Sequence, residues 1–130
     1  MKILVIDDDP ALTELLKLVL AKTNADIITS NSGIEGLELA RSEHPDIILL
    51  DLMMPEMNGW EVCKAVRAFS RIPILILSAL DNPAMIAKAL DAGADDYLVK
   101  PVPSGMLIIH INNLMRRSTT ASMTLAEATS

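Results

Sequence analysis

Residues 46–59 read DIILLDLMMPEMNG, the clearest passage from strand to loop in the chain. The first half is a short run of Ile and Leu, typical of a strand buried on both faces. The second half contains Met, Pro, Asn and Gly, which end the strand. Asp51 lies between the two halves. A buried carboxylate requires a cation, a donor or a chemical role, although a turn or helix cap is the simpler alternative for a lone Asp.

Similar apolar runs alternate with segments of helical periodicity along the chain. The predicted strands are residues 2–7, 24–30, 46–51, 73–78 and 94–99, and the predicted helices are residues 10–22, 33–42, 59–69, 83–92 and 104–117. Pro10 and Pro83 stand where a helix can begin, and Gly93 follows the end of one. This alternation predicts right-handed crossovers and a mostly parallel sheet. The predicted fold class is therefore α/β, a doubly wound five-stranded parallel sheet between two layers of helices.

The composition restricts the class of protein. A length of 130 residues suits one domain, and aromatic residues at 2% leave no platform for stacking nucleobases. The net charge of -6 argues against direct nucleic-acid binding by this domain. Cys63 is alone and lies among apolar helix positions, so we expect a buried, inert thiol and a reducing, cytoplasmic location. No apolar run approaches the ~18 residues of a membrane span, so we expect no membrane contact.

Polar side chains stand at the ends of four of the predicted strands. The first ends in Asp7 and Asp8, the third in Asp51, the fourth in Ser78 and the fifth in Lys100. Ligands of such sheets bind beyond the carboxyl ends of the strands, so we expect these groups at one edge. A hard divalent cation such as Mg2+ relieves repulsion among carboxylates and also takes phosphate oxygens. With charge withdrawn by the metal and Lys100, Asp51 is suited to accept a phosphoryl group as an acyl phosphate.

Four motifs in order resemble a known family. They are IDDDP at 6–10, DLMMPEMNG at 51–59, ILSA at 76–79 and GADDYLVKP at 93–101. Over residues 2–117 they resemble the receiver domains of two-component response regulators, which include the chemotaxis regulators. The resemblance implies a flavodoxin-like sandwich with the strand order 2-1-3-4-5. It also implies a phosphorelay module that catalyses only its own phosphorylation and dephosphorylation and is otherwise no enzyme.

The resemblance assigns the metal and acceptor roles residue by residue. Asp51 would be the phosphoacceptor and become 4-aspartylphosphate. Asp8 would bind Mg2+ directly, and Asp7 mainly through water. Asp51 itself and the backbone carbonyl of Met53 would complete the protein ligands, and Mn2+ could substitute for Mg2+.

The resemblance also implies how the phosphoryl group is sensed. Lys100 and Ser78 would contact the phosphoryl oxygens, and the peptide bond between Lys100 and Pro101 would be cis. We expect Ser78 to move toward phosphorylated Asp51 and Tyr97 to turn into the vacated space. This would change the surface formed by residues 83–92, 94–99 and 104–117. Tyr97 is equally compatible with a half-buried strand position.

The implied partners are a sensor histidine kinase and a downstream effector domain or protein. Related receivers often dimerise through complementary charges on the surface just named. Residues 104–117 instead contain more apolar side chains than one buried stripe requires. They are Met106, Ile108, Ile109, Ile111 and Leu114. We therefore expect this surface to meet a partner or a second copy of the chain, without the charged pattern.

Residues 118–130, STTASMTLAEATS, have no usable apolar period. We expect a domain at residues 1–117 followed by a flexible tail or the start of a linker at 118–130. A receiver cut from a longer protein and a stand-alone protein both fit this pattern.

Two other functions fit the same architecture. A small Mg2+-dependent phosphohydrolase would also use an aspartyl phosphate, but it would need a cap over the substrate and a second acid for the leaving group. A flavin carrier would need a Ser-, Thr- and Gly-rich loop where Asp7, Asp8 and Asp9 stand. Both are therefore less favoured than the receiver.

Several other polar residues are expected to have ordinary roles. His44 and His110 lack a second ligand at metal spacing, so we expect surface or packing positions. Asp95 and Asp96 are expected to be solvated. Trp60 is predicted to pack at the start of its helix.

Overall fold

The computed structural model describes the backbone of residues 1–129 and the side chains of residues 1–118. Strands and helices alternate as predicted. In chain order they are β1 (Lys2–Ile6), α1 (Pro10–Leu20), the short 3-10 helix η1 (Ala21–Thr23), β2 (Asp26–Ser30), α2 (Gly33–Glu43), β3 (Ile47–Leu50), α3 (Gly59–Arg67), β4 (Ile74–Ser78), α4 (Pro83–Asp91), β5 (Asp96–Val99) and α5 (Ser104–Thr129).

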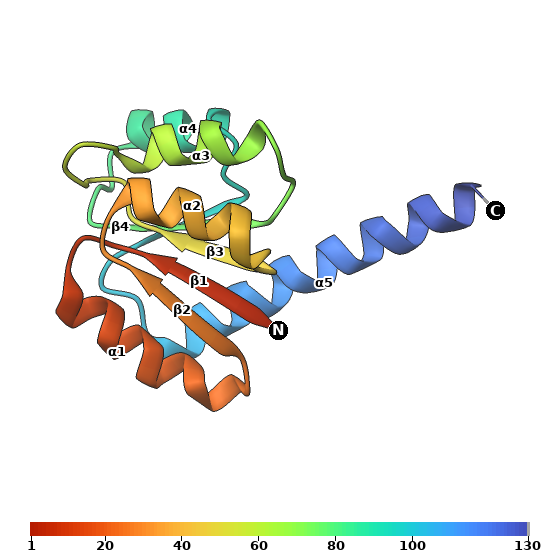
Figure 1. Ribbon diagram of the computed structural model, residues 1–130, viewed down its shortest axis with the longest axis horizontal. Coiled ribbons are helices and arrows are strands. Elements are labelled where there is room, and N and C mark those ends of the chain that lie inside the picture. Colours follow the sequence, from red (N-terminus) through yellow and green to blue (C-terminus); the bar gives the residue numbers. More distant parts are fainter. Residues whose placement is uncertain (130) are drawn as a thin grey trace.

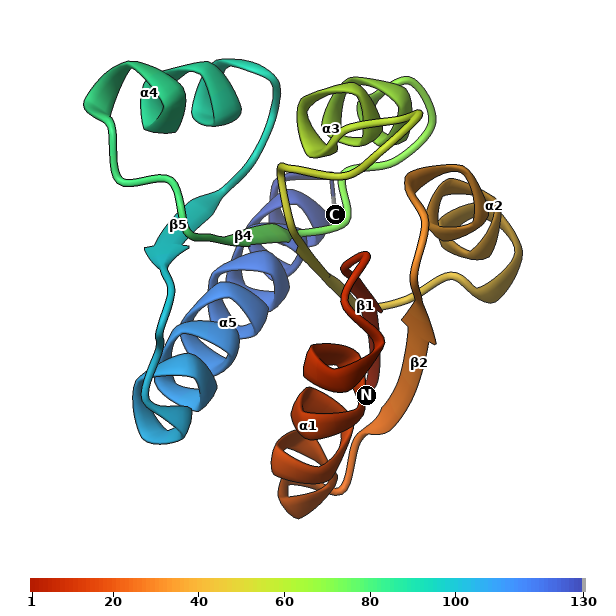
Figure 2. The ribbon, with the colours of Figure 1, turned by 90° about the vertical axis from the view of Figure 1, so that its left-hand side faces the viewer.

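The five strands form one parallel sheet in the order β2-β1-β3-β4-β5. Helices α2, α3 and α4 cover one face, and α1 and α5 cover the other (Figures 1 and 2). The predicted fold class and strand order are confirmed. Because the order reverses at β1, the crevice between β1 and β3 opens at the carboxyl ends of the strands.

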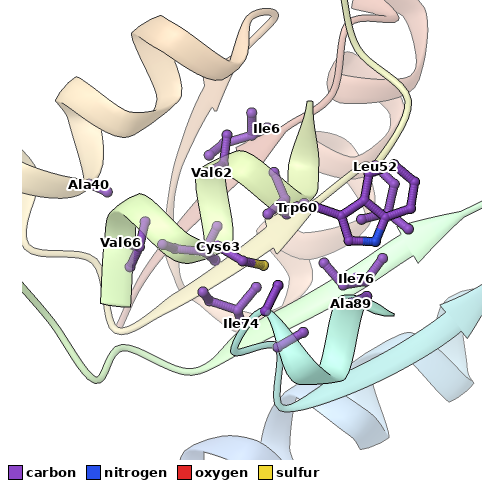
Figure 3. Close-up of a cluster of buried hydrophobic side chains, with 14 of the residues drawn as sticks. Ile6, Ala40, Leu52, Trp60, Val62, Cys63, Val66, Ile74, Ile76 and Ala89 are labelled. Carbon is purple, nitrogen blue, oxygen red and sulfur yellow. The ribbon is translucent and has the colours of Figure 1, made fainter. Parts of the chain in front are cut away.

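Each face of the sheet has its own hydrophobic core. Alternate residues of β1 point to opposite faces, so Leu4 and Ile6 pack toward α2 and α3, and Ile3 and Val5 pack toward α1 and α5. Trp60 and Cys63 of α3 lie in the first of these cores (Figure 3). Burial on both faces explains the continuous apolar runs of the central strands.

Side-chain caps begin four helices at the carboxyl edge of the sheet, and on α2 the hydroxyl of Ser32 accepts from the amide of Glu35. Asp9 accepts from the backbone amides at the start of α1, and Asn82 does the same for α4. Asn58 and Glu61 form a reciprocal capping box on α3. These caps give the loops after β1, β2, β3 and β4 defined ends.

Helix α5 is longer than predicted. We expected it to end near Arg117, yet it continues to Thr129 and extends beyond the sheet (Figure 1). Neither Gly nor Pro occurs after Gly105, so no residue in this segment breaks the helix. Residues 118–129, predicted to be a flexible tail or the start of a linker, are therefore helical, and Ser130 lies outside the described residues. The division of the chain at residue 117 stays a prediction. Within residues 1–129, no helix has the length and apolar character of a membrane span.

Candidate functional site

Three carboxylates meet where β1 and β3 end. Oxygens of Asp7, Asp8 and Asp51 lie within 4.8 Å of one another, and these residues are called the acid cluster below. Strands β1 and β3 are neighbours, and the amide of Asp51 donates to the carbonyl of Ile6 at 2.9 Å. Asp7 and Asp51 are buried, whereas Asp8 is exposed. The topology thus brings together the acids that the sequence placed at separate strand ends.

Lys100 brings a positive charge to the acid cluster from beyond β5. Its Nζ lies 2.7 Å from Oδ2 of Asp7 and 3.8 Å from Oδ1 of Asp51. The peptide bond between Lys100 and Pro101 is cis, as the resemblance implied. The three carboxylates share one ammonium, which lies beside two of them, so the cluster keeps a negative charge that suits a divalent cation.

The environment of Asp51 disfavours its charged form. Burial raises the pKa of this carboxyl above its ordinary value, and the charge of Asp7 raises it further, with a smaller contribution from Asp8. Lys100 and the amide of Leu52, which donates to Oδ1 of Asp51 at 2.8 Å, act in the opposite direction. The unfavourable effects prevail, so a cation in the cluster would stabilise the charged form of Asp51.

The loop after Asp51 returns close to it. The amide of Gly59 donates to the carbonyl of Leu52 at 2.9 Å. A Cβ at Gly59 would lie 2.3 Å from the carbonyl oxygen of Asp51, so only glycine fits there. Met53 lies in this loop with an exposed side chain, and its role as a backbone ligand stays a prediction.

Ser78 and Tyr97, the two predicted switch residues, bind the same backbone residue. The amide of Leu80 donates to Oγ of Ser78 at 3.2 Å, and the hydroxyl of Tyr97 donates to the carbonyl of Leu80 at 2.6 Å. Ser78 is fully buried, and Tyr97 is half-buried. Leu80 therefore links the end of β4 to β5, which the sequence could not indicate because the link uses only its backbone.

Two acids that we expected to be solvated also have partners, although Asp95 is exposed and Asp96 is partly exposed. Oδ2 of Asp95 lies 2.9 Å from the guanidinium of Arg67 and also accepts from the amide of Ile74. Oδ2 of Asp96 lies 2.6 Å from Nδ1 of His110. Each pair joins elements that are far apart in the sequence, so residue type alone did not reveal it.

Trp60 and Cys63 are buried in the core as predicted. Burial raises the pKa of the Cys63 thiol to about 11, which agrees with an inert thiol.

Asn31 was missed by the sequence analysis. It follows β2, and its Nδ2 donates to the carbonyl of Asp7 at 2.8 Å and to Oγ1 of Thr13 at 3.1 Å. A lone Asn after a strand is common in turns, so the sequence contains no signal for this contact.

Comparison with known proteins agrees with this geometry. The family model described as the response regulator receiver domain matches residues 3–112. The chain belongs to this receiver domain family. The resemblance seen in the four motifs is thereby confirmed. The chain is a receiver domain of a two-component response regulator, and the acid cluster lies in this domain. The phosphohydrolase alternative is not favoured, because the similar proteins are signalling proteins.

Two curated relatives of the receiver are named as regulators. The DNA-binding response regulator MtrA of Mycolicibacterium smegmatis is 40% identical over 117 residues, covering 90% of this chain and 51% of that protein. The transcriptional regulatory protein AfsQ1 of Streptomyces coelicolor is 39% identical over 115 residues, covering 88% of this chain and 51% of that protein. The chain thus spans about half the length of these relatives.

Solved receiver domains match the whole fold. The receiver domain of the Francisella response regulator 1452 is 36% identical with a TM-score of 0.84, covering 90% of this chain and 98% of that chain. The BeF3-activated N-terminal receiver domain of Klebsiella pneumoniae RstA is 31% identical with a TM-score of 0.86, covering 89% of this chain and 99% of that chain.

Proposed function

We propose that this receiver takes a phosphoryl group from a sensor histidine kinase onto Asp51, with Mg2+ in the acid cluster. The observation that carries the proposal is the meeting of the three carboxylates within 4.8 Å, with Lys100 beside two of them. The catalysis that we propose is limited to the phosphorylation and dephosphorylation of Asp51.

The acid cluster fits Mg2+ because all its donors are oxygens. Both oxygens of Asp7 are already engaged, Oδ1 by the amide of Asp9 and Oδ2 by Lys100. This supports an indirect role for Asp7 through water, and direct binding by Asp8 and Asp51. The Met53 carbonyl is proposed as a further ligand. When bound, the ion would draw negative charge from the acceptor and from the phosphoryl oxygens.

In the transfer step, a carboxylate oxygen of Asp51 attacks the phosphorus atom. A new P–O bond forms while the P–N bond to the donor imidazole breaks, and the departing nitrogen keeps the electron pair and takes a proton from water. Lys100 remains close enough to contact a phosphoryl oxygen. Positioning and charge neutralisation do most of the work, since the carboxylate needs no general base.

The signal is proposed to leave the site through Ser78. Turning its hydroxyl toward the new phosphoryl group would release the amide of Leu80, whose carbonyl binds Tyr97. Movement of Leu80 and Tyr97 would then change the surface of α4, β5 and α5. This is a shift between existing conformations, which phosphorylation biases.

The surface of α4, β5 and α5 is proposed to contact the effector or a second copy of the chain. Its exposed apolar side chains come from all three elements, namely Leu90, Val99, Met106 and Ile109. The names of MtrA and AfsQ1 suggest an effector that controls transcription through DNA. The receiver itself, with its net charge of -6, is not proposed to bind DNA.

The kinase is proposed to dock on α1 and the segment that leads into α5, next to Lys100. Leu15 and Leu18 of α1 are 55% and 70% exposed. An apolar groove of about 540 Å³ lies between α1 and the segment from Lys100 to Leu107. An apolar helix of the donor kinase could pack against this surface.

The proposed location of the protein is the cytoplasm.

Phosphorylation of the purified chain tests the function. We expect one added phosphoryl group by intact mass after incubation with a small acyl phosphate and Mg2+. Asp51→Asn should remove this label, and removal of Mg2+ should slow its formation. Equal labelling of the Asp51→Asn protein would refute the assignment of Asp51. Rapid turnover of general phosphomonoesters would favour the hydrolase instead.

A further inference from the structure

We propose that Asn31 is a positioning residue for Mg2+ binding, an inference that rests on the proposed function of the acid cluster. Its side chain holds the peptide group between Asp7 and Asp8 in the orientation that directs the Asp8 carboxylate at the metal. The contact is the 2.8 Å hydrogen bond from Nδ2 of Asn31 to the carbonyl of Asp7. It reaches the acid cluster from β2, a strand that contributes no acid to it.

The geometry of the peptide group gives this hydrogen bond its effect. A peptide group is planar and turns as one unit, so holding its oxygen restricts ψ of Asp7 and φ of Asp8 together. The preceding peptide group is held as well, because the amide of Asp7 donates to the carbonyl of Ser30 at 3.0 Å. Ser30 and Asn31 thus restrain the backbone on both sides of Asp7.

Asp8 depends on this restraint more than Asp7 does. The carboxylate of Asp7 binds Lys100 and the amide of Asp9. Among residues 1–118, no protein group binds the carboxylate of Asp8, which is exposed. The direction of its side chain is therefore set mainly by its backbone. A looser backbone would let Asp8 turn away, and ordering it again would cost part of the metal-binding free energy.

Asn31 is itself held in place by Thr13 of α1. Oγ1 of Thr13 accepts from Nδ2 of Asn31 at 3.1 Å and donates to the carbonyl of Pro10 at 3.1 Å. Thr13 is buried and Asn31 is exposed, so the hydrogen bond between them is partly buried. The carbonyl of Asp7 can only accept, so the amino end of the Asn31 amide must face it. An Asn side chain is short, and with two anchored contacts it has little freedom to move.

The proposal is tested by isothermal titration calorimetry, in which the whole chain is titrated with Mg2+ alone. Asn31→Ala should raise the Kd for Mg2+ by about 10-fold, the low end for residues that orient a metal ligand. The rate of phosphorylation at saturating Mg2+ should stay within about twofold of wild type, because the metal restores the geometry. Asn112→Ala, a change at an exposed Asn of α5, is the matched control and should leave the Kd unchanged.

Thr13→Val removes the anchor and keeps the shape of the side chain. It should weaken Mg2+ binding in the same direction, and the double variant should bind no more weakly than Asn31→Ala alone. A Kd for Asn31→Ala within about twofold of wild type would overturn the proposal, as would fully additive effects in the double variant. These results are read from metal binding. Failure of Asp51 as the acceptor would appear only in the phosphorylation assay, so the two proposals fail separately.

Discussion

Charged side chains are paired at the amino ends of the strands but are in excess at the carboxyl ends. At the amino edge, where β4 and β5 begin, each of the three nitrogens of the Arg67 guanidinium donates a hydrogen bond. They donate to the carbonyls of Gly93, Ser70 and Ile72 and to the carboxylate of Asp95. At the carboxyl edge, the acid cluster has three carboxylates and one lysine. Charge is matched at the first edge and left in excess at the second.

This difference separates charges that stabilise the fold from charges that serve binding. Satisfied hydrogen bonds from a charged donor hold two loops together at the amino edge. Unmatched carboxylates at the carboxyl edge cost stability until a cation binds there. A variant that removes a charge at the amino edge should therefore lower the stability of the fold. Variants at the carboxyl edge should instead slow phosphorylation or raise the stability.

The largest loss of stability is expected at the amino edge. Arg67→Met removes four hydrogen bonds, and we expect unfolding to become about 2 to 4 kcal/mol easier, measured by urea denaturation. The Kd for Mg2+ should not change. Arg71→Met, at an exposed Arg of the loop that follows α3, should cost less than about 0.5 kcal/mol. Equal losses for both variants would mean that the Arg67 contacts do not stabilise the fold.

The next effect is a loss of activity at the carboxyl edge. Lys100→Met should slow phosphorylation by an acyl phosphate about 100-fold, because a cation beside Asp51 is lost where negative charge is transferred. Intact-mass time courses at saturating Mg2+ measure this. Lys64→Met, at an exposed Lys of α3, is the control and should react like wild type. A normal rate in Lys100→Met would remove Lys100 from the proposed mechanism.

A smaller effect of opposite sign is expected from Asp51→Asn. Burial raises the pKa of Asp51 in the folded state, so its charged form costs stability at neutral pH. Without metal, the variant should therefore melt higher at pH 7, where each 1 kcal/mol corresponds to about 3–5 °C. The gain should shrink as the pH falls through the raised pKa, and it should vanish below the ordinary pKa of Asp, about 3.9.

Calorimetric melting of Asp51→Asn and wild type between pH 3 and 8 measures this difference. Glu38→Gln, at an exposed Glu of α2, neutralises a carboxylate away from the cluster and should change little. A lower melting temperature for Asp51→Asn at pH 7 would mean that Lys100 stabilises the charged form of Asp51 more than burial and Asp7 oppose it.

The smallest effect tests whether Mg2+ binding at the carboxyl edge affects the hydrophobic core that contains Cys63. Cys63 is fully buried and its thiol has a pKa of about 11, so almost none is thiolate at pH 7. Alkylation of Cys63 by iodoacetamide should be slow in the native protein. In denaturant its rate should match that of an exposed cysteine. Adding Mg2+ should leave the native rate unchanged. A marked slowing by Mg2+ would show that the core of α3 opens together with the site.

The order of elements was predictable because its signals are local. Caps and prolines mark the starts of α1 and α4, and continuous apolar runs mark the central strands. Only the end of α5 was wrong by more than a few residues, because a segment without Gly or Pro has no local signal to end a helix. The meeting of Asp7, Asp8 and Asp51 was also predictable, since parallel strands end at one edge.

The supporting contacts of the site were not predictable. Asn31 binds the carbonyl of Asp7 from 24 residues away, and Tyr97 reaches Leu80 across 17. The partners in these contacts are backbone carbonyls, which every residue has, so residue type says nothing about them. The pairing of Asp95 with Arg67 likewise depends on the packing of the end of α3 against the loop before β5.

The sequence by itself determined the parallel sheet, the family and the group of acids at one edge, because periodicity, caps and motif spacing are written along the chain. The tertiary structure alone decided which charge is matched and which is left in excess. Lys100 lies nearer to Asp7 than to Asp51, Arg67 takes Asp95, and Asn31 holds the turn between two acids. Distance and burial set these interactions, and both arise only when the chain has folded.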